Sequence, residues 1–220
     1  MSNETVSSNT LDKRSTVIAV IIIGAMFFIF GLVSWVNAIL IPYFKIACEL
    51  THFESYFVAF AFYIAYLVMS VPSAFLLKRV GYKKGMMVGF FFMAAGALIF
   101  VPAALTRTYG IFLTGLFTIG TGLAILQSAA NPYITIVGPI ESAAKRMSIM
   151  GVCNKFAGIV SPLIFAAVVL KVSDSDMFTL LESGTLDEVA KNNMLDELIR
   201  RVILPYSVLS ALLFAFGLFI

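Results

Sequence analysis

Four carboxamide side chains interrupt the long apolar runs of this sequence and are its first candidates for binding chemistry. Asn37 lies in the first run, Gln127 and Asn131 in the fourth, and Asn154 in the fifth. A carboxamide donates and accepts hydrogen bonds without carrying a charge, and burying one without a partner costs on the order of 1–3 kcal/mol. We therefore expect each amide to face a neighbouring helix or a water-filled cavity, where it would suit the hydroxyls of a sugar. The alternative is that the amides only join helices to one another.

Two of these amides are spaced to act together. Gln127 and Asn131 stand at positions i and i+4, which places them on one face of a helix. Pro132 has no backbone N–H, so the carbonyl of Ser128 loses its usual helical partner beside both amides. This concentration of unpaired donors and acceptors favours a site for ligand hydroxyls.

Aromatic residues and one lysine are further candidates. Trp35, Tyr63 and Tyr66 are suited to stack against the C–H faces of a pyranose ring. Because 14% of the residues are aromatic, ordinary packing is the alternative for each. Lys155 is the only charged residue well inside a run. It either has a binding role or extends its amine to the membrane surface, about 10 Å away at 1.5 Å per residue.

The residues that are missing exclude several classes of chemistry. No Asp or Glu lies inside any apolar run, so this chain has no intramembrane carboxylate of the kind that relays protons or cations. Cys48, Cys153 and His52 provide neither a disulfide framework nor a metal-ligand cluster, and we expect no cofactor and no metal. His52 falls in a loop and cannot form the buried Ser-His dyad of an intramembrane protease. We therefore expect that the chain is not an enzyme.

The elements that position these residues must be membrane-spanning helices. Sixty per cent of the residues are apolar, only 12% are charged, and the mean hydropathy is +0.99. Soluble domains are about half apolar and a quarter charged. A run of about 20 apolar residues crosses the bilayer as a helix, which satisfies its own backbone hydrogen bonds. The sequence predicts an all-α membrane protein, a six-transmembrane-helix bundle with runs at about 17–41, 55–77, 85–105, 109–137, 148–170 and 202–220.

Basic residues predict how the bundle is oriented. Most lie in the tail or short loops of one side, at Lys13-Arg14, Lys78-Arg79, Lys83-Lys84 and Lys145-Arg146. The short loops of the other side offer only Lys45 and Arg107. The basic side of an inner-membrane protein is cytoplasmic, so residues 1–16 are predicted to form a cytoplasmic N-terminal tail in the plasma membrane of the cell. A net charge of +3, tied to helix ends, does not indicate a nucleic-acid partner.

The remaining connection is long and acidic. Residues 171–201 hold seven of the twelve acidic residues and are predicted to form an outer loop. The chain stops at Ile220 inside its sixth apolar run, which favours a truncated protein over a natural half.

An internal repeat appears when the sequence is shifted by 90 residues. Residues 37–43 (NAILIPY) fall on residues 127–133 (QSAANPY), and 71–75 (VPSAF) fall on 161–165 (SPLIF). The two copies cover about 17–105 and 109–220. A repeat of three spans has an odd number of crossings, so the second copy is inverted in the membrane, a frequent design of secondary transporters.

The motifs in these segments resemble one known family. Residues 37–42 (NAILIP), 129–133 (AANPY), Gly138-Pro139 and the loop 77–85 (LKRVGYKKG) are similar to the N-terminal half of the fucose/glucose/galactose group of major facilitator superfamily sugar symporters. The resemblance implies a twelve-helix protein that binds a sugar at the midplane between two six-helix halves and works by alternating access. The partners it implies are the C-terminal half, the lipid bilayer, a small-molecule sugar and a coupling cation.

The sequence departs from this family at the positions that carry its proton chemistry. Fucose relatives have an Asp where this chain has Ala38, and a Glu where it has Gln127. In the loop signature, Lys78 replaces an Asp and Ala74 replaces a Gly. The resemblance therefore favours the glucose/galactose branch, with N-acetylhexosamine as a further substrate, and leaves coupling to a proton or to sodium open.

A different class of function remains as the alternative. The helices suit a membrane sensor or an assembly partner that transports nothing. The two hypotheses differ in the DNA beyond Ile220, because a transporter gene continues in frame for about six more spans.

Overall fold

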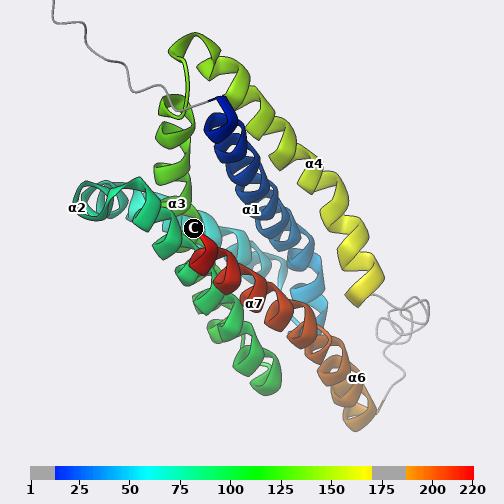
Figure 1. Cartoon of the computed structure of the whole chain (residues 1–220). Helices are drawn as coiled ribbons and strands as arrows, with labels where there is room; N and C mark the ends of the chain where they lie inside the picture. The colour runs from blue at the N-terminus through cyan, green and yellow to red at the C-terminus, as the bar shows by residue number, and fades with distance from the viewer. Residues whose placement is uncertain (1–12, 170–186) are drawn as a thin grey trace, which may run out of the picture.

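A computed structural model describes residues 13–169 and 187–220, without the side chains of 13–15, 37, 38 and 42. All regular elements within these ranges are helical, which confirms the predicted all-α class (Figure 1). The elements in chain order are α1 (Lys13–Ala47), α2 (His52–Thr106), α3 (Tyr109–Ile136), the short 3₁₀ helix η1 (Ile140–Ser142), α4 (Ala143–Val169), α6 (Glu188–Arg200) and α7 (Ile203–Phe219).

Helix α2 contains two of the predicted spans. Its 55 residues would extend about 80 Å as a straight helix, far more than the roughly 30 Å of a bilayer core. The backbone breaks at Gly81, whose φ of 76° lies in the region that glycine adopts without strain. The legs 52–80 and 82–106 fold back on each other, since the side chain of Leu77 lies against Gly85. Within the residues that the structure describes, five helices are long and apolar enough to cross a membrane. The length and the break of α2 are those of two crossings.

The ends of α2 are set by local capping residues. Thr51 and Glu54 form a capping box, in which Thr51 Oγ1 accepts from the Glu54 N–H at 3.2 Å and Glu54 Oε2 accepts from the Thr51 N–H at 2.8 Å. At the other end, Arg107 adopts a left-handed conformation with φ 47°, and its N–H donates to the carbonyl of Ala103. This turn allows α3 to start two residues later.

Two close glycine contacts join the halves of the predicted repeat. A Cβ on Gly31 of α1 would lie 2.5 Å from the carbonyl oxygen of Asn154 on α4. A Cβ on Gly120 of α3 would lie 2.4 Å from the carbonyl oxygen of Phe62 on the first leg of α2. The glycines are 89 residues apart and their partners 92 apart, close to the 90-residue shift of the sequence repeat. The two contacts thus occur at nearly the spacing of the predicted repeat.

The second leg of α2 also packs against α7. Phe90 and Phe216 lie 5.7 Å apart between ring centroids, and Phe91 and Phe214 lie 5.1 Å apart. Ser210 Oγ donates to the carbonyl of Ala94 at 2.8 Å.

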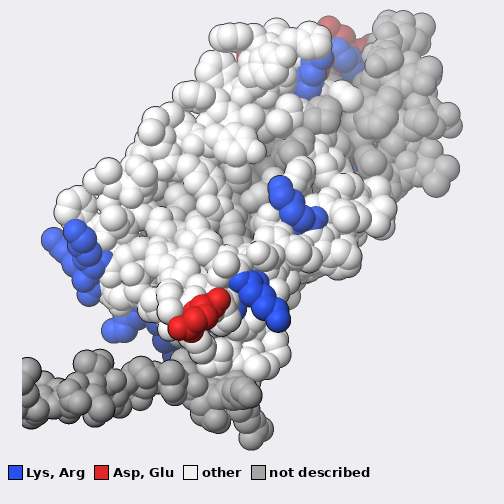
Figure 2. Space-filling model, turned by 90° about the horizontal axis from the view of Figure 1, so that it is seen from above, with Lys and Arg blue, Asp and Glu red and all other residues white. Residues whose placement is uncertain are grey.

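Charged residues mark the two ends of the bundle, and Figure 2 shows that most of the viewed face carries none. The end beside α6, called here the α6 end, is held by a polar cluster. Arg107 donates to Asp196 at 3.2 Å and to Asn192 at 3.0 Å, and it lies 3.7 Å from Glu49. Lys191 also pairs with Glu49. These contacts attach α6 to the ends of α1 and α2.

Helix α6 lies within the segment that the sequence analysis describes as an acidic loop. Residues 171–186 of that segment lie outside the described residues, whereas 188–200 are helical. Leu195, Leu198 and Ile199 form the buried face of α6. The helix forms because these apolar residues share one face and the charged ones lie on the other.

Arg146 lies at the opposite end of the bundle, called here the basic end. Only 5% of its surface is exposed, although the sequence indicates only a topology marker at this position. Its guanidinium donates to the carbonyls of Ile134, Thr135 and Pro139 at 2.9–3.0 Å. The last carbonyls of a helix have no N–H partner within the helix, and a positive charge there is also favoured by the helix dipole. Arg146 therefore fixes the turn between α3 and α4.

Candidate binding site

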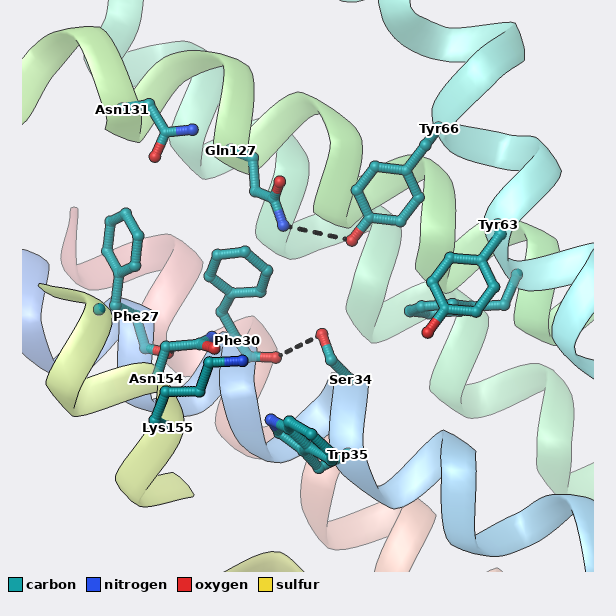
Figure 3. A pocket seen from close by; sticks show the side chains of 12 residues that line it. Phe27, Phe30, Ser34, Trp35, Tyr63, Tyr66, Gln127, Asn131, Asn154 and Lys155 are labelled. Carbon is teal, nitrogen blue, oxygen red and sulfur yellow. Dashed lines mark hydrogen bonds between the residues drawn. The ribbon is translucent and has the colours of Figure 1, made fainter. Parts of the chain in front are cut away.

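A cavity of about 590 Å³ opens between α1, the first leg of α2, α3 and α4 (Figure 3). This volume falls within the roughly 300–1,000 Å³ that small-molecule pockets occupy. It is lined by Phe27, Phe30, Ser34, Trp35, Phe62, Tyr63, Tyr66, Gln127, Asn131, Gly151, Asn154 and Lys155. The structure thus brings together seven of the eight residues singled out from the sequence. The side chain of the eighth, Asn37, lies outside the described residues.

Gln127 and Asn131 line one wall of the cavity from α3. Gln127 Nε2 donates to the hydroxyl of Tyr66 at 3.3 Å, which ties the amide to the first leg of α2. Asn131 is exposed and its side chain makes no hydrogen bond with the described residues. The pair therefore offers one amide oriented by a neighbour and one available to a ligand.

Asn154 lines the facing wall and also joins two helices. Its Nδ2 donates to the carbonyl of Phe27 at 3.3 Å, across from α4 to α1. The absence of a side chain at Gly31 makes room for this amide, because a Cβ there would lie 3.0 Å from Asn154 Nδ2. The helix-joining role considered from the sequence thus accounts for one N–H of Asn154.

The indole ring of Trp35 packs against α4 beside this wall. A Cβ on Gly158 would lie 2.8 Å from the indole Nε1, so the ring rests on bare backbone of α4. The Lys155 amine lies 5.3 Å from the centroid of the Trp35 ring, a cation–π contact, and Trp35 is 40% exposed. The lysine side chain is directed toward the cavity rather than extended along α4 to the membrane surface (Figure 3).

Tyr63 and Tyr66 stand on the first leg of α2. Their ring centroids lie 6.5 Å apart, and the ring of buried Phe62 lies 5.9 Å from that of Tyr66. Tyr63 is 64% exposed and presents most of its ring at the mouth of the cavity. Both tyrosines are available to contact a ligand, and Tyr66 also orients Gln127.

Several residues on α1 line the cavity although no sequence motif indicated them. Phe27, Phe30 and Ser34 line the cavity, and Ser34 Oγ donates to the carbonyl of Phe30 at 2.9 Å. With Trp35 they recur at intervals of three, four and one, the spacing of one helix face. Plotting the first apolar run as a helix, and taking the residues on the same face as Trp35, would have identified them.

The sequence matches a family model and several curated proteins. Residues 11–173 match the family model described as Major Facilitator Superfamily. A glucose/galactose transporter of Brucella abortus biovar 1 (strain 9-941) is 36% identical over 171 residues, which cover 78% of this chain and 42% of the relative. The L-fucose-proton symporter of Escherichia coli K12 is 31% identical over 222 residues, covering 99% of this chain and 50% of the relative.

A solved structure agrees with these relatives. The transporter FucP, named in a second structure as the fucose:proton symporter of E. coli, superposes in its outward conformation with a TM-score of 0.78 at 30% identity. The match covers 94% of this chain and 49% of FucP, so the chain spans about half the length of the relatives it matches.

These matches confirm the resemblance that the sequence motifs indicated. The prediction that the chain is not an enzyme is confirmed as well, because the relatives are named as transporters and symporters. The chain is a multi-pass membrane protein and belongs to the Major Facilitator Superfamily.

Proposed function

We propose that this chain is the N-terminal half of a secondary transporter for a hexose or a related sugar. The observation that carries the proposal is the cavity, where amide groups on opposite walls are flanked by aromatic rings. Sugar hydroxyls pair with neutral amides, and the C–H faces of a pyranose stack on aromatic rings. The relatives named as glucose/galactose transporter and fucose-proton symporter support the same substrate class.

In this proposal the cavity is one half of a shared site. A C-terminal six-helix half covers it from the open side, and the two halves rock to expose the sugar to one side of the membrane at a time. Gln127 stands at the position of a coupling carboxylate in fucose relatives but cannot titrate. Any coupling cation is therefore bound with the help of other residues.

The test uses a probe that the chain already contains. Trp35 is the only tryptophan in the sequence and lines the cavity. We expect a saturable change in its fluorescence when the purified chain is titrated with glucose, galactose, fucose or N-acetylglucosamine. Glycerol serves as the control for non-specific effects of polyols. If no sugar gives a saturable change, the proposal of a sugar site in this cavity is wrong.

We predict that Gln127→Ala weakens sugar binding. Losing one buried hydrogen bond to the ligand costs on the order of 1–3 kcal/mol, a roughly 5- to 150-fold rise in Kd. Asn37→Ala is expected to behave alike if the sequence repeat pairs these two positions. The measurement is the Trp35 titration of each variant, with exposed Asn193→Ala on α6 as the control. Unchanged affinity in both variants would assign the two amides to helix packing.

We also propose that the basic end faces the cytoplasm and the α6 end the outside of the inner membrane. The support is the distribution of lysine and arginine, which is biased toward cytoplasmic loops in membrane proteins. Cys48 follows the last residue of α1 at the α6 end, whereas Cys153 lies in α4 near Gly24.

This orientation predicts which cysteine an impermeant thiol reagent reaches from the periplasmic side. Only Cys48 should be labelled, and slowly at neutral pH. Burial raises the pKa of the Cys48 thiol to about 11, while the charge of Arg107 opposes the rise. Because the thiolate is the nucleophile, labelling should accelerate about tenfold per pH unit below that pKa.

Arg107→Ala removes the opposing charge and should slow the labelling of Cys48 further. The Cys48→Ser variant provides the background rate. Labelling of Cys153 alone under these conditions would reverse the proposed orientation.

A further inference from the structure

One charged group enters the cavity at mid-helix. Lys155 is residue 13 of the 27 in α4, so it lies about 18 Å from the start of the helix at 1.5 Å per residue. A charged side chain at this depth of a membrane protein is costly and marks a polar or ligand-binding site. Its amine contacts the face of Trp35.

No carboxylate balances this charge within the cavity. The other residues that line it are uncharged, and Lys155 forms no ion pair with any residue in 13–169 or 187–220 for which the structure gives a side chain. A neutral hexose would use the amides and aromatic rings but has no group that requires an ammonium. The unbalanced charge therefore points to an anionic ligand group.

The charge is confined to one wall of the cavity. Lys155 comes from α4, whereas the lining residues of the first leg of α2 include Tyr63 and Tyr66, whose hydroxyls are neutral. The wall of α2 thus presents a neutral hydroxyl where the wall of α4 presents an ammonium.

A single ammonium also limits the kind of anion. No arginine lines the cavity and no described helix begins there, so the paired donors that usually hold a phosphate dianion are missing from the described walls. One lysine matches one carboxylate. The exposed ring of Trp35 beside it favours a ring-closed sugar over an open chain.

We propose that the cavity takes a pyranose that carries one carboxylate, a hexuronate, and that Lys155 pairs with this carboxylate while the amides of Gln127 and Asn131 bind hydroxyls. The proposal rests on the proposed sugar-binding function and narrows its substrate class. On binding, the amine leaves the face of Trp35 for the carboxylate, and the ring becomes free to stack on the sugar.

The experiment compares a neutral sugar with its acid in the same titration. Trp35 fluorescence of the purified chain is followed with galactose, galacturonate and open-chain gluconate at constant pH and low salt. We expect galacturonate to bind at least tenfold more tightly than galactose and than gluconate. Raising the salt concentration should weaken the binding of galacturonate but not of galactose.

Variants identify the residue responsible. Lys155→Gln should remove the preference for galacturonate, Lys155→Arg should keep it, and Lys84→Gln at the exposed turn of α2 should leave it unchanged. Circular dichroism and gel filtration establish that each variant folds.

The outcomes separate this inference from the proposed function. Saturable binding of galactose without tighter binding of galacturonate would overturn the inference and leave the sugar site standing. A preference that persists in Lys155→Gln would overturn it as well. If neither compound binds saturably, both the inference and the sugar site are wrong.

Discussion

Gly31→Ala and Gly120→Ala will each destabilise the bundle, although alanine is the better helix former by about 1 kcal/mol. The added methyl group would stand 2.5 Å and 2.4 Å from backbone carbonyl oxygens of Asn154 and Phe62, which cannot move without separating two helices. Overpacking of this kind costs roughly 1–3 kcal/mol. Helix association in membranes depends on close approach of this sort, because lipid tails provide no hydrophobic drive between helices.

The measurement is the temperature at which half of the purified protein leaves the monodisperse gel-filtration peak. We expect a fall on the order of 10 °C for each variant. Gly110→Ala and Gly151→Ala are matched controls, because a Cβ at either position has no heavy atom within 4 Å. These two should be neutral or slightly stabilising. Equal behaviour of all four variants would show that the close contacts do not hold the bundle together.

The second large effect concerns transport by the chain alone. We expect no sugar uptake when the 220-residue chain is reconstituted in liposomes. Alternating access requires two bundles that rock around a shared site at the midplane, and one bundle cannot close the cavity from either side.

The measurement is counterflow of radiolabelled glucose, galactose, N-acetylglucosamine and galacturonate, with the chain alone and with the downstream half co-expressed. Uptake on co-expression only would support the assignment as half of a transporter. Saturable, competable uptake by the chain alone would contradict it and would indicate a homodimeric carrier. A chain that binds sugar but supports no uptake in either condition would favour the sensor hypothesis.

Several features of the site follow from sequence spacing alone. The i, i+4 spacing of Gln127 and Asn131 placed them on one wall, and the structure has both lining the cavity. Ser34 and the phenylalanines before it share the face of Trp35 and were identifiable by the same argument. Periodicity works here because it depends only on the geometry of one helix.

Other features depended on which helices became neighbours. Three contacts join residues from different helices or turns. Lys155 lies over Trp35, Arg146 is buried under the end of α3, and Trp35 packs against the backbone at Gly158. Hydropathy does not predict such contacts, since a helix face toward lipid and one toward another helix are both apolar.

The sequence by itself determined the membrane-spanning class, the number of crossings, the basic and acidic ends and the family, because these follow from run length, charge position and local motifs. Only the tertiary structure decided that α6 continues the chain as a helix across 188–200, and that one wall of the cavity carries a cation with no ion-pair partner among the described residues. The reason is that the role of a polar group within a membrane depends on the residues next to it, and the packing of the helices decides which residues those are.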